Sequence, residues 1–264
     1  MSRHPCAAVL LLVAAFAGTS ASADIGAAGQ PRPPAIVVAV AASLSDVMSE
    51  LARRHEQATG QAVRLNVGGS NFLARQIVEG AASAADVFVS ADDVQMDVVA
   101  TAGRLVAGTR AALLTNRLVV VGRPGGTVTV TAARDLGAGD VRRVALGNPD
   151  SVPAGVYARR WLEGQGVWAA VAPKVVPTVT VRAALAAARA GRVDAAVVYV
   201  TDAATVPSLP VLYRVPAGDT PPIVYPVAVV AGPRQDAATR FVAFLRSAAA
   251  MAVFAAAGFG AAGA

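Results

Sequence analysis

Residues 36–52 read IVVAVAASLSDVMSELA, and they predict the first unit of the fold. The apolar run 36–40 has the length and the β-branched residues of a buried strand. Ser43 or Ser45 can cap the start of a following helix, and Gly60 can end it. Apolar residues mark one face of that helix at the expected three- and four-residue spacing: Leu44, Val47, Met48, Leu51 and Ala52. A strand followed at once by an amphipathic helix is the building unit of α/β sheets.

The same alternation of apolar runs and helical patterns continues along the chain. Further strands are predicted at 63–67, 86–89, 118–121, 143–146, 195–199 and 224–230. Further helices are predicted at 71–79, 93–100, 155–164, 181–190 and 237–257, the last of these as two helices. Residues 24–34 form a flexible leader, and 258–264 form a tail of small residues that we expect to fray.

Two segments, 112–121 and 221–230, have the pattern of crossings between two lobes. We therefore expect an α/β protein with two lobes, each built on a mixed, mostly parallel sheet flanked by helices. Lobe 1 comprises residues 35–115 and 226–264, and lobe 2 comprises residues 116–225. A ligand would bind in the cleft between the lobes, where strand ends and helix starts meet.

Four predicted helix starts carry small or hydroxyl residues: 41–46, 68–71, 152–155 and 178–182. The first turn of a helix has unpaired N–H groups and the positive end of the helix dipole. Four such starts directed at one point would bind an anion without any cationic side chain. The sequence therefore predicts an oxyanion-binding site.

The first 23 residues have the pattern of a secretory signal. A short basic segment precedes the apolar run 6–18, and the small residues Ala21-Ser22-Ala23 follow. The apolar run is shorter than the ~20 residues that span a bilayer, which favours cleavage after Ala23 over a membrane anchor. We expect a soluble protein exported to the periplasm.

The composition excludes several kinds of site. The only cysteine, Cys6, lies in the predicted signal, so the mature chain has no disulfide and no thiolate metal site. His55 is then the only histidine, and its polar surroundings predict a solvated surface residue. The net charge of +6 comes mainly from scattered arginines without interleaved aromatic residues, which argues against a nucleic-acid interface.

Several strings along residues 36–260 resemble the periplasmic molybdate-binding proteins of ABC transporters. They are AASLSDVM (41–48), LARQI (73–77), ADVFVSAD (85–92), NPDSVPAGVYA (148–158), VVYVTDA (197–203) and YPVAVV (225–230). The resemblance implies the two-lobed fold of type II periplasmic binding proteins. It also implies a receptor, likewise periplasmic and monomeric, that passes molybdate or tungstate to a membrane permease, with no cofactor and no catalysis.

The resemblance further implies which residues hold the anion. They are Ser43 and Ser70 through their hydroxyls, Ala154 and Val181 through backbone N–H groups, and Tyr199 through its hydroxyl. The molybdenum is held as the oxyanion, with no direct metal ligand. Gly68 and Gly69 stand where relatives often carry further serines, so this loop offers no extra hydroxyl.

Other interpretations of these residues stay open at this stage. Ser43 and Ser70 can be simple helix caps, and Tyr199 can be a core aromatic residue. Arg182 fits a structural role at the rim, and the aspartates 46, 92 and 202 fit caps or contacts between lobes. Alternative functions are a receptor for another oxyanion such as sulfate or phosphate, a serine hydrolase that uses His55 as base, and an exported adhesion or signalling module.

Overall fold

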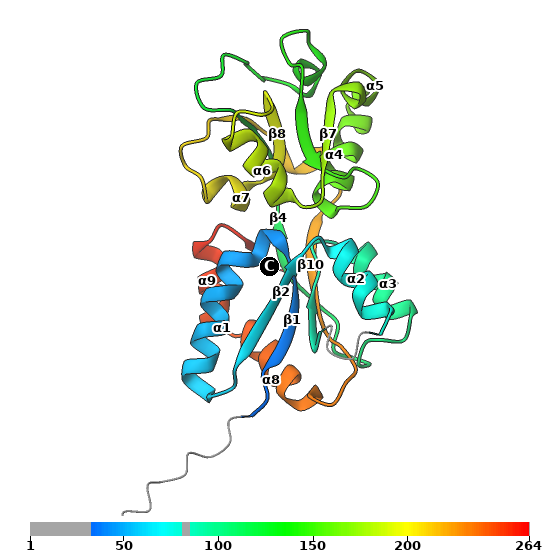
Figure 1. The fold of residues 1–264 in the computed structure, drawn as a ribbon, viewed down its shortest axis with the longest axis vertical. Helices are drawn as coiled ribbons and strands as arrows, with labels where there is room; N and C mark the ends of the chain where they lie inside the picture. Colours follow the sequence, from blue (N-terminus) through cyan, green and yellow to red (C-terminus); the bar gives the residue numbers. More distant parts are fainter. Residues whose placement is uncertain (1–32, 81–84, 264) are drawn as a thin grey trace, which may run out of the picture. The chain divides into compact units, whose positions relative to one another are not determined.

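The alternating strands and helices assemble into two β-sheets (Figure 1). This computed structural model describes residues 33–80 and 85–263, and Pro33–Ala264 form one compact unit. The predicted signal peptide, 1–23, and nearly all of the leader, 24–34, lie outside the described residues. Within them, the strands form one sheet of six strands and one of five.

The six-stranded sheet has the order β11-β4-β10-β3-β1-β2. Its strands are β1 (Ile36–Ala41), β2 (Val63–Gly68), β3 (Val87–Val89), β4 (Ala111–Asn116), β10 (Ile223–Val229) and β11 (Gly260–Ala261). The strand β1 pairs in parallel with β2 and β3, whereas β10 runs antiparallel to β3 and β4. The sheet is therefore mixed, because β10, which returns from the other sheet, and the short β11 run against the other four strands.

Alternate side chains of β1 point to opposite faces of this sheet. Val38 and Val40 pack in the cluster that contains residues of α1 (Ser45–Thr59), α8 (Gln235–Leu245) and α9 (Ala248–Ala256). Ala39 points to the opposite face, in the cluster with α2 (Ser70–Val78) and α3 (Asp93–Thr101). The two-residue period of a strand explains why a continuous apolar run is needed when helices cover both faces.

The five-stranded sheet has the order β7-β6-β8-β5-β9. Its strands are β5 (Leu118–Gly122), β6 (Val144–Gly147), β7 (Val175–Thr178), β8 (Ala195–Tyr199) and β9 (Val211–Arg214). The helices that accompany it are α4 (Pro153–Gly164), α5 (Trp168–Val171), α6 (Val181–Arg189) and α7 (Val200–Ala204). Short 3-10 turns lie at Ala42–Leu44, Ala133–Gly137, Ala172–Lys174 and Ala217–Asp219.

The chain passes from the first sheet to the second between Asn116, the end of β4, and Leu118, the start of β5. It returns between Arg214, the end of β9, and Ile223, the start of β10. Residues from 36–116 and 223–261 thus build the six-stranded sheet, and residues from 118–214 build the other. The connections are short, so the two sheets are joined next to the C-terminal ends of β4 and β8.

The C-terminal region differs from the sequence prediction. The segment 258–264 was expected to fray, but Gly260 and Ala261 pair with Thr115 and Leu114 of β4. Phe259 is buried and packs edge to face on Tyr225, with ring centroids 5.6 Å apart, which anchors the segment. The preceding region does form two helices, with a bend of 60° between them, and in the described part of the chain no single helix is long and apolar enough to cross a membrane.

The prediction for His55 was wrong. The side chain is buried, with 4% of its surface exposed, and lies against the rings of Phe241 and Phe244 at centroid distances of 5.0 and 5.1 Å. His55 follows Met48 by seven residues and Leu51 by four, which places it on the buried face of α1. The helical period was a better guide to its environment than its charged neighbours.

Candidate functional site

A small cavity brings the sequence-predicted site residues together. Its volume is about 10 Å³, roughly the room of one water-sized sphere. It is lined by Ala41, Ala42, Ser43, Gly69, Ser70, Ala91, Val152, Pro153, Ala154, Thr180, Val181 and Tyr199. All five residues implied by the resemblance are among them. They come from both sheets: two serines from the elements after β1 and β2, and the other three from α4, α6 and β8.

Ser43 does not cap the first helix, as the sequence suggested that it can. The chain forms a 3-10 turn at Ala42–Leu44 before α1, and Leu44 is the N-cap residue, with no side-chain capping bond. The Ser43 hydroxyl is instead 3.0 Å from the hydroxyl of Tyr225, which lies 182 residues later in the chain. The side chain is 3% exposed. The serine is thus a buried polar group beside the cavity, not a solvated cap.

Ser70 is likewise no cap, because Gly69 occupies the N-cap position of α2 and Ser70 is the first residue of the helix. Its Oγ accepts a hydrogen bond from the backbone N–H of Ala91 at 3.0 Å. The side chain is 1% exposed. Since the oxygen already accepts from an amide, the hydroxyl proton remains available for an acceptor in the cavity.

Ala154 and Val181 lie in the first turns of α4 and α6. Pro153 begins α4, where its missing N–H costs nothing and its fixed φ suits the helix. Thr180 caps α6 by accepting from Ala183 N at 3.1 Å. N–H groups in the first turn have no partner within their own helix, so each helix start offers donors and partial positive charge to the cavity.

Tyr199 ends β8 and is 1% exposed. Within the described residues its hydroxyl has no hydrogen-bond partner. Burial raises the pKa of this hydroxyl well above its ordinary value, so it stays protonated and neutral. A buried hydroxyl without a partner costs about 1–3 kcal/mol. That cost is recovered if the hydroxyl donates to a bound acceptor.

The cavity lining carries no charged side chain among the described residues. Its donors are hydroxyls and backbone amides, all neutral, and they come from several directions. Such an arrangement can hold a dehydrated anion, because hydrogen bonds to a charged acceptor are short and strong. Within the described residues, neither serine has a hydrogen bond to a carboxylate or an imidazole.

The comparison with known families gives a direct result. A family described as "Bacterial extracellular solute-binding protein" matches residues 36–260. The chain belongs to this family. Its relatives include the molybdate-binding protein ModA of Escherichia coli K12, 33% identical over 252 residues that cover 92% of this chain and 96% of that protein. ModA of Mycobacterium tuberculosis H37Rv is 34% identical over 240 residues, 90% of this chain and 88% of that protein.

Solved structures of type II periplasmic binding proteins share the fold of this solute-binding protein. The molybdate-binding protein of Azotobacter vinelandii superimposes with a TM-score of 0.76 at 23% identity, covering 85% of this chain and 98% of that one. The sulfate-binding protein SubI of Mycobacterium tuberculosis H37Rv gives 0.75 at 18% identity, covering 88% of each chain. These likenesses show the fold, and they include receptors for two different oxyanions.

Arg182 of the solute-binding protein forms ion pairs with a helix next to each of the two sheets, α1 and α7. Its Nη2 lies 2.8 Å from Asp46 of α1, and its Nε lies 2.6 Å from Asp202 of α7. The Asp46 side chain is 67% exposed, so that pair is worth at most about 1 kcal/mol. Asp202 is fully buried and also accepts from Tyr199 N at 3.4 Å. Arg182 therefore compensates a buried carboxylate that helps to hold the backbone of Tyr199.

Two carboxyl groups near the cavity have raised pKa values. Burial raises the pKa of Asp202 to about 6, although the charge of Arg182 opposes the rise. Burial likewise raises the pKa of Asp92 to about 6. As expected for a capping residue, Asp92 accepts from Gln95 N at 3.0 Å at the start of α3. Neither group lines the cavity.

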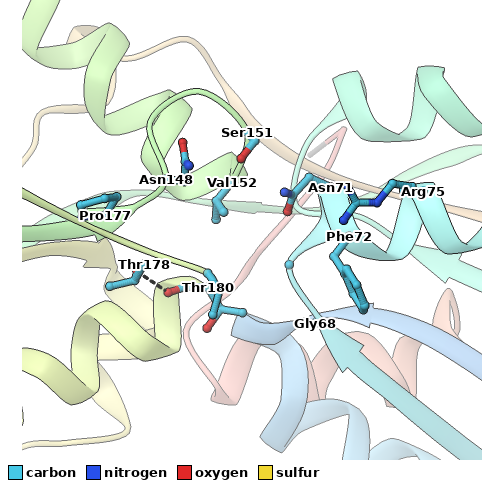
Figure 2. Close-up of a pocket in the computed structure, with 12 residues that line it drawn as sticks. Gly68, Asn71, Phe72, Arg75, Asn148, Ser151, Val152, Pro177, Thr178 and Thr180 are labelled. Atoms are coloured by element: carbon cyan, nitrogen blue, oxygen red, sulfur yellow. Dashed lines mark hydrogen bonds between the residues drawn. The ribbon is translucent and has the colours of Figure 1, made fainter.

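A wider cavity of about 530 Å³ adjoins the small one (Figure 2). The two share Gly69, Val152 and Thr180 in their linings. Phe72 and Arg75 of α2 lie on one side of it, and Figure 2 shows Asn148, Ser151 and Pro177 on the other. The small cavity thus lies next to a wider space with α2 on one side and residues 148–152 and 177–180 on the other.

Sequence reasoning missed two residues that support the site, Tyr225 and Asn116. Asn116 Nδ2 donates to the Tyr225 hydroxyl at 3.2 Å and to the Thr201 hydroxyl at 2.9 Å. A signal was present, because the polar triplet 115–117 interrupts an apolar run. A polar side chain at that place needs a buried partner, but the sequence does not identify which one.

Proposed function

We propose that this protein is the receptor of an ABC transporter that captures molybdate and delivers it to the membrane permease. The observation that carries the proposal is the convergence of five neutral donors, Ser43, Ser70, Ala154, Val181 and Tyr199, on one cavity without a charged side chain. The relatives that cover most of the chain are named for molybdate binding, which supports this ligand over others.

The donor set suits a fully dehydrated dianion. Each buried donor that lacks an acceptor costs about 1–3 kcal/mol, so an anion that is too small for the ring of donors loses affinity steeply. Molybdate and tungstate have longer metal–oxygen bonds than the sulfur–oxygen bonds of sulfate. Two or three stretched hydrogen bonds would amount to a factor of thousands at that rate. We include tungstate as a second ligand on this ground.

A receptor for sulfate or phosphate is the alternative, and the fold does not decide between them because SubI shares it. A serine hydrolase is disfavoured by the surroundings of His55, which is buried against two phenylalanine rings of α8. We therefore propose binding without catalysis. An adhesion or signalling module would give no reason for buried donors around a small cavity.

We propose that the two sheets are the cores of two lobes that open and close about the connections between β4 and β5 and between β9 and β10. A cavity of about 10 Å³ has less room than four oxygens around a metal need, so the lobes must separate to admit the anion. The wider cavity offers the path. Binding within a closing cleft fits a monomeric periplasmic receptor exported by the predicted signal peptide.

Isothermal titration of the mature protein with molybdate, sulfate and phosphate tests the proposal. We expect one-to-one binding of molybdate that excess sulfate does not displace. Ser43→Ala should weaken binding by about 1–3 kcal/mol with the fold intact, because one buried donor is lost. Ser49→Ala is the matched control, since its exposed hydroxyl bonds only to Ser45 O. Preferred binding of sulfate or phosphate would establish the alternative, and no binding of any oxyanion would reject both.

A further inference from the structure

A chain of hydrogen bonds extends from the connection between β4 and β5 to Ser43. Asn116, at the end of β4, donates through Nδ2 to the Tyr225 hydroxyl at 3.2 Å. The Tyr225 hydroxyl is in turn 3.0 Å from Ser43 Oγ. Tyr225 is fully buried. Neither Asn116 nor Tyr225 lines the small cavity, so neither contacts the anion directly. Tyr225 contacts two residues that do line it, Ser43 through the hydroxyl and Tyr199 through the ring.

The orientation of the Asn116 amide fixes which group donates at the start of this chain of hydrogen bonds. Its Oδ1 accepts from the backbone N–H of Arg117 at 2.9 Å, and an amide turned the other way would place two donors against each other. The nitrogen therefore faces Tyr225 and Thr201, and it can only donate.

The direction in which each hydroxyl donates its proton then follows. The Tyr225 oxygen accepts from Asn116, so its own proton is directed to Ser43 Oγ. Ser43 accepts that proton, and its own hydroxyl proton is left for the cavity. The reverse direction would give the Tyr225 oxygen two incoming donors, and its buried proton would lack an acceptor, because the neighbouring Tyr199 hydroxyl forms no hydrogen bond with it within the described residues.

We propose that Asn116 and Tyr225 are positioning residues that hold Ser43 as a donor and so restrict the site to fully deprotonated tetrahedral anions. The inference rests on the proposed function and adds a second basis for selectivity, the protonation state of the anion. Ser70 has the same fixed role, since its oxygen accepts from Ala91 N. A protonated anion would have to direct its O–H at Tyr199 or Thr180, the other two hydroxyls of the lining. Thr180 Oγ1 already accepts from Ala183 N, and the proton of Tyr199 would then lack an acceptor.

Phosphate is the informative probe, because at neutral pH it keeps at least one proton whereas molybdate and sulfate keep none. Tyr225→Phe removes the donor to Ser43 and preserves the ring that packs against Phe259. Ser43 can then rotate and present a lone pair to a protonated anion. We expect molybdate to bind about tenfold more weakly and the ratio of molybdate to phosphate affinity to fall by at least about tenfold.

Asn116→Leu and the double variant test whether the two residues act in series. Removing the amide frees Tyr225 to accept from Ser43, so the affinity ratio should fall in the same direction as in Tyr225→Phe. In the Tyr225→Phe background, Asn116→Leu should change molybdate affinity less than twofold, because the connection is already broken. Tyr213→Phe is the matched control, because Tyr213 belongs to β9 of the other sheet and its ring stacks on Trp161 of α4, with centroids 6.0 Å apart.

We test the proposal by titration calorimetry of each variant with molybdate and with inorganic phosphate. Thermal unfolding of each variant shows whether it is folded. An unchanged molybdate-to-phosphate ratio in folded Tyr225→Phe overturns the proposal, and so do additive losses in the double variant. If Tyr225→Phe does not fold, the ratio in Asn116→Leu decides by the same criterion. If the wild type prefers sulfate over molybdate, the proposed function fails, and the inference is then tested with sulfate against phosphate.

Discussion

Replacing Arg182 by alanine should destabilise the protein in a way that depends strongly on pH. The guanidinium lies 2.6 Å from Asp202, whose side chain is fully buried. Removing it leaves a buried carboxylate without its cation, which costs about 3–5 kcal/mol when the carboxylate is charged. The pKa of Asp202 is already about 6, raised by burial, and it would rise further without Arg182.

The sign of the pH dependence follows from this raised pKa. A carboxyl group whose pKa is higher in the folded state than in the unfolded chain binds its proton more tightly when folded, so stability falls as pH rises. In the wild type this loss occurs between about pH 4 and the folded pKa of about 6, and amounts to about 3 kcal/mol for a rise of two pKa units. In Arg182→Ala the loss continues above pH 6, so the two proteins diverge there by up to about 1.4 kcal/mol per pH unit.

Urea unfolding at pH 5, 6, 7 and 8 without oxyanion measures the divergence. We expect Arg182→Ala to lose about 1 kcal/mol at pH 5, the value of one hydrogen bond, and about 3–4 kcal/mol at pH 8. Asp46→Asn, which breaks only the exposed pair, should cost less than about 1 kcal/mol at every pH. Adding Asp202→Asn to Arg182→Ala should remove the divergence. A loss of the same size at pH 5 and pH 8 would refute the reasoning.

Three further predictions concern backbone approach and a buried ring. Gly69→Ala should weaken molybdate binding, measured by titration calorimetry, with little change in thermal stability. The added Cβ would lie 2.7 Å from Asn71 Oδ1 and 2.9 Å from the carbonyl oxygen of Val179, which precedes α6 beside the other sheet. Gly155→Ala should destabilise the fold by several kcal/mol in urea unfolding, well beyond the ~1–3 kcal/mol usual for overpacking, because its Cβ would lie 1.9 Å from the Gly147 carbonyl oxygen. Burial lowers the pKa of His55, so the folded state resists its protonation and wild-type stability is lost as pH falls below the ordinary value of 6.5. His55→Leu should lose less stability than the wild type between pH 7 and 5, and equal losses would contradict the assignment.

Strong periodicity made the first βα unit predictable, and weaker signals failed for identifiable reasons. The helix α1 ends at Gly60 with φ of 72°, as the C-cap pattern indicated. The strand β7 was missed because Pro177 interrupts it, and proline usually argues against a strand. As β7 is at the edge of its sheet, the missing N–H is tolerated there.

The residues that line the candidate site were predictable from the sequence, but the residues that hold them in place were not. Local sequence marks Ser43 and Ser70 as helix-start residues, and the resemblance assigned them to the anion. The partner of Ser43 is 182 residues away, at a position set by the antiparallel pairing of β10 with β4. Capping statistics favour a serine that bonds to its own helix, and tertiary contacts overrode them at both positions.

The neutral lining of the small cavity has a consequence for the charge of the complex. No described side chain there gains or loses a charge to match the anion, and the four hydroxyls are far from titrating at neutral pH. Both negative charges of a bound dianion would therefore be added in full to the net charge of the protein. Because the chain has a net charge of +6, the loaded receptor would remain cationic and would leave a cation-exchange column earlier than the empty one, and its electrophoretic mobility would report occupancy without any label.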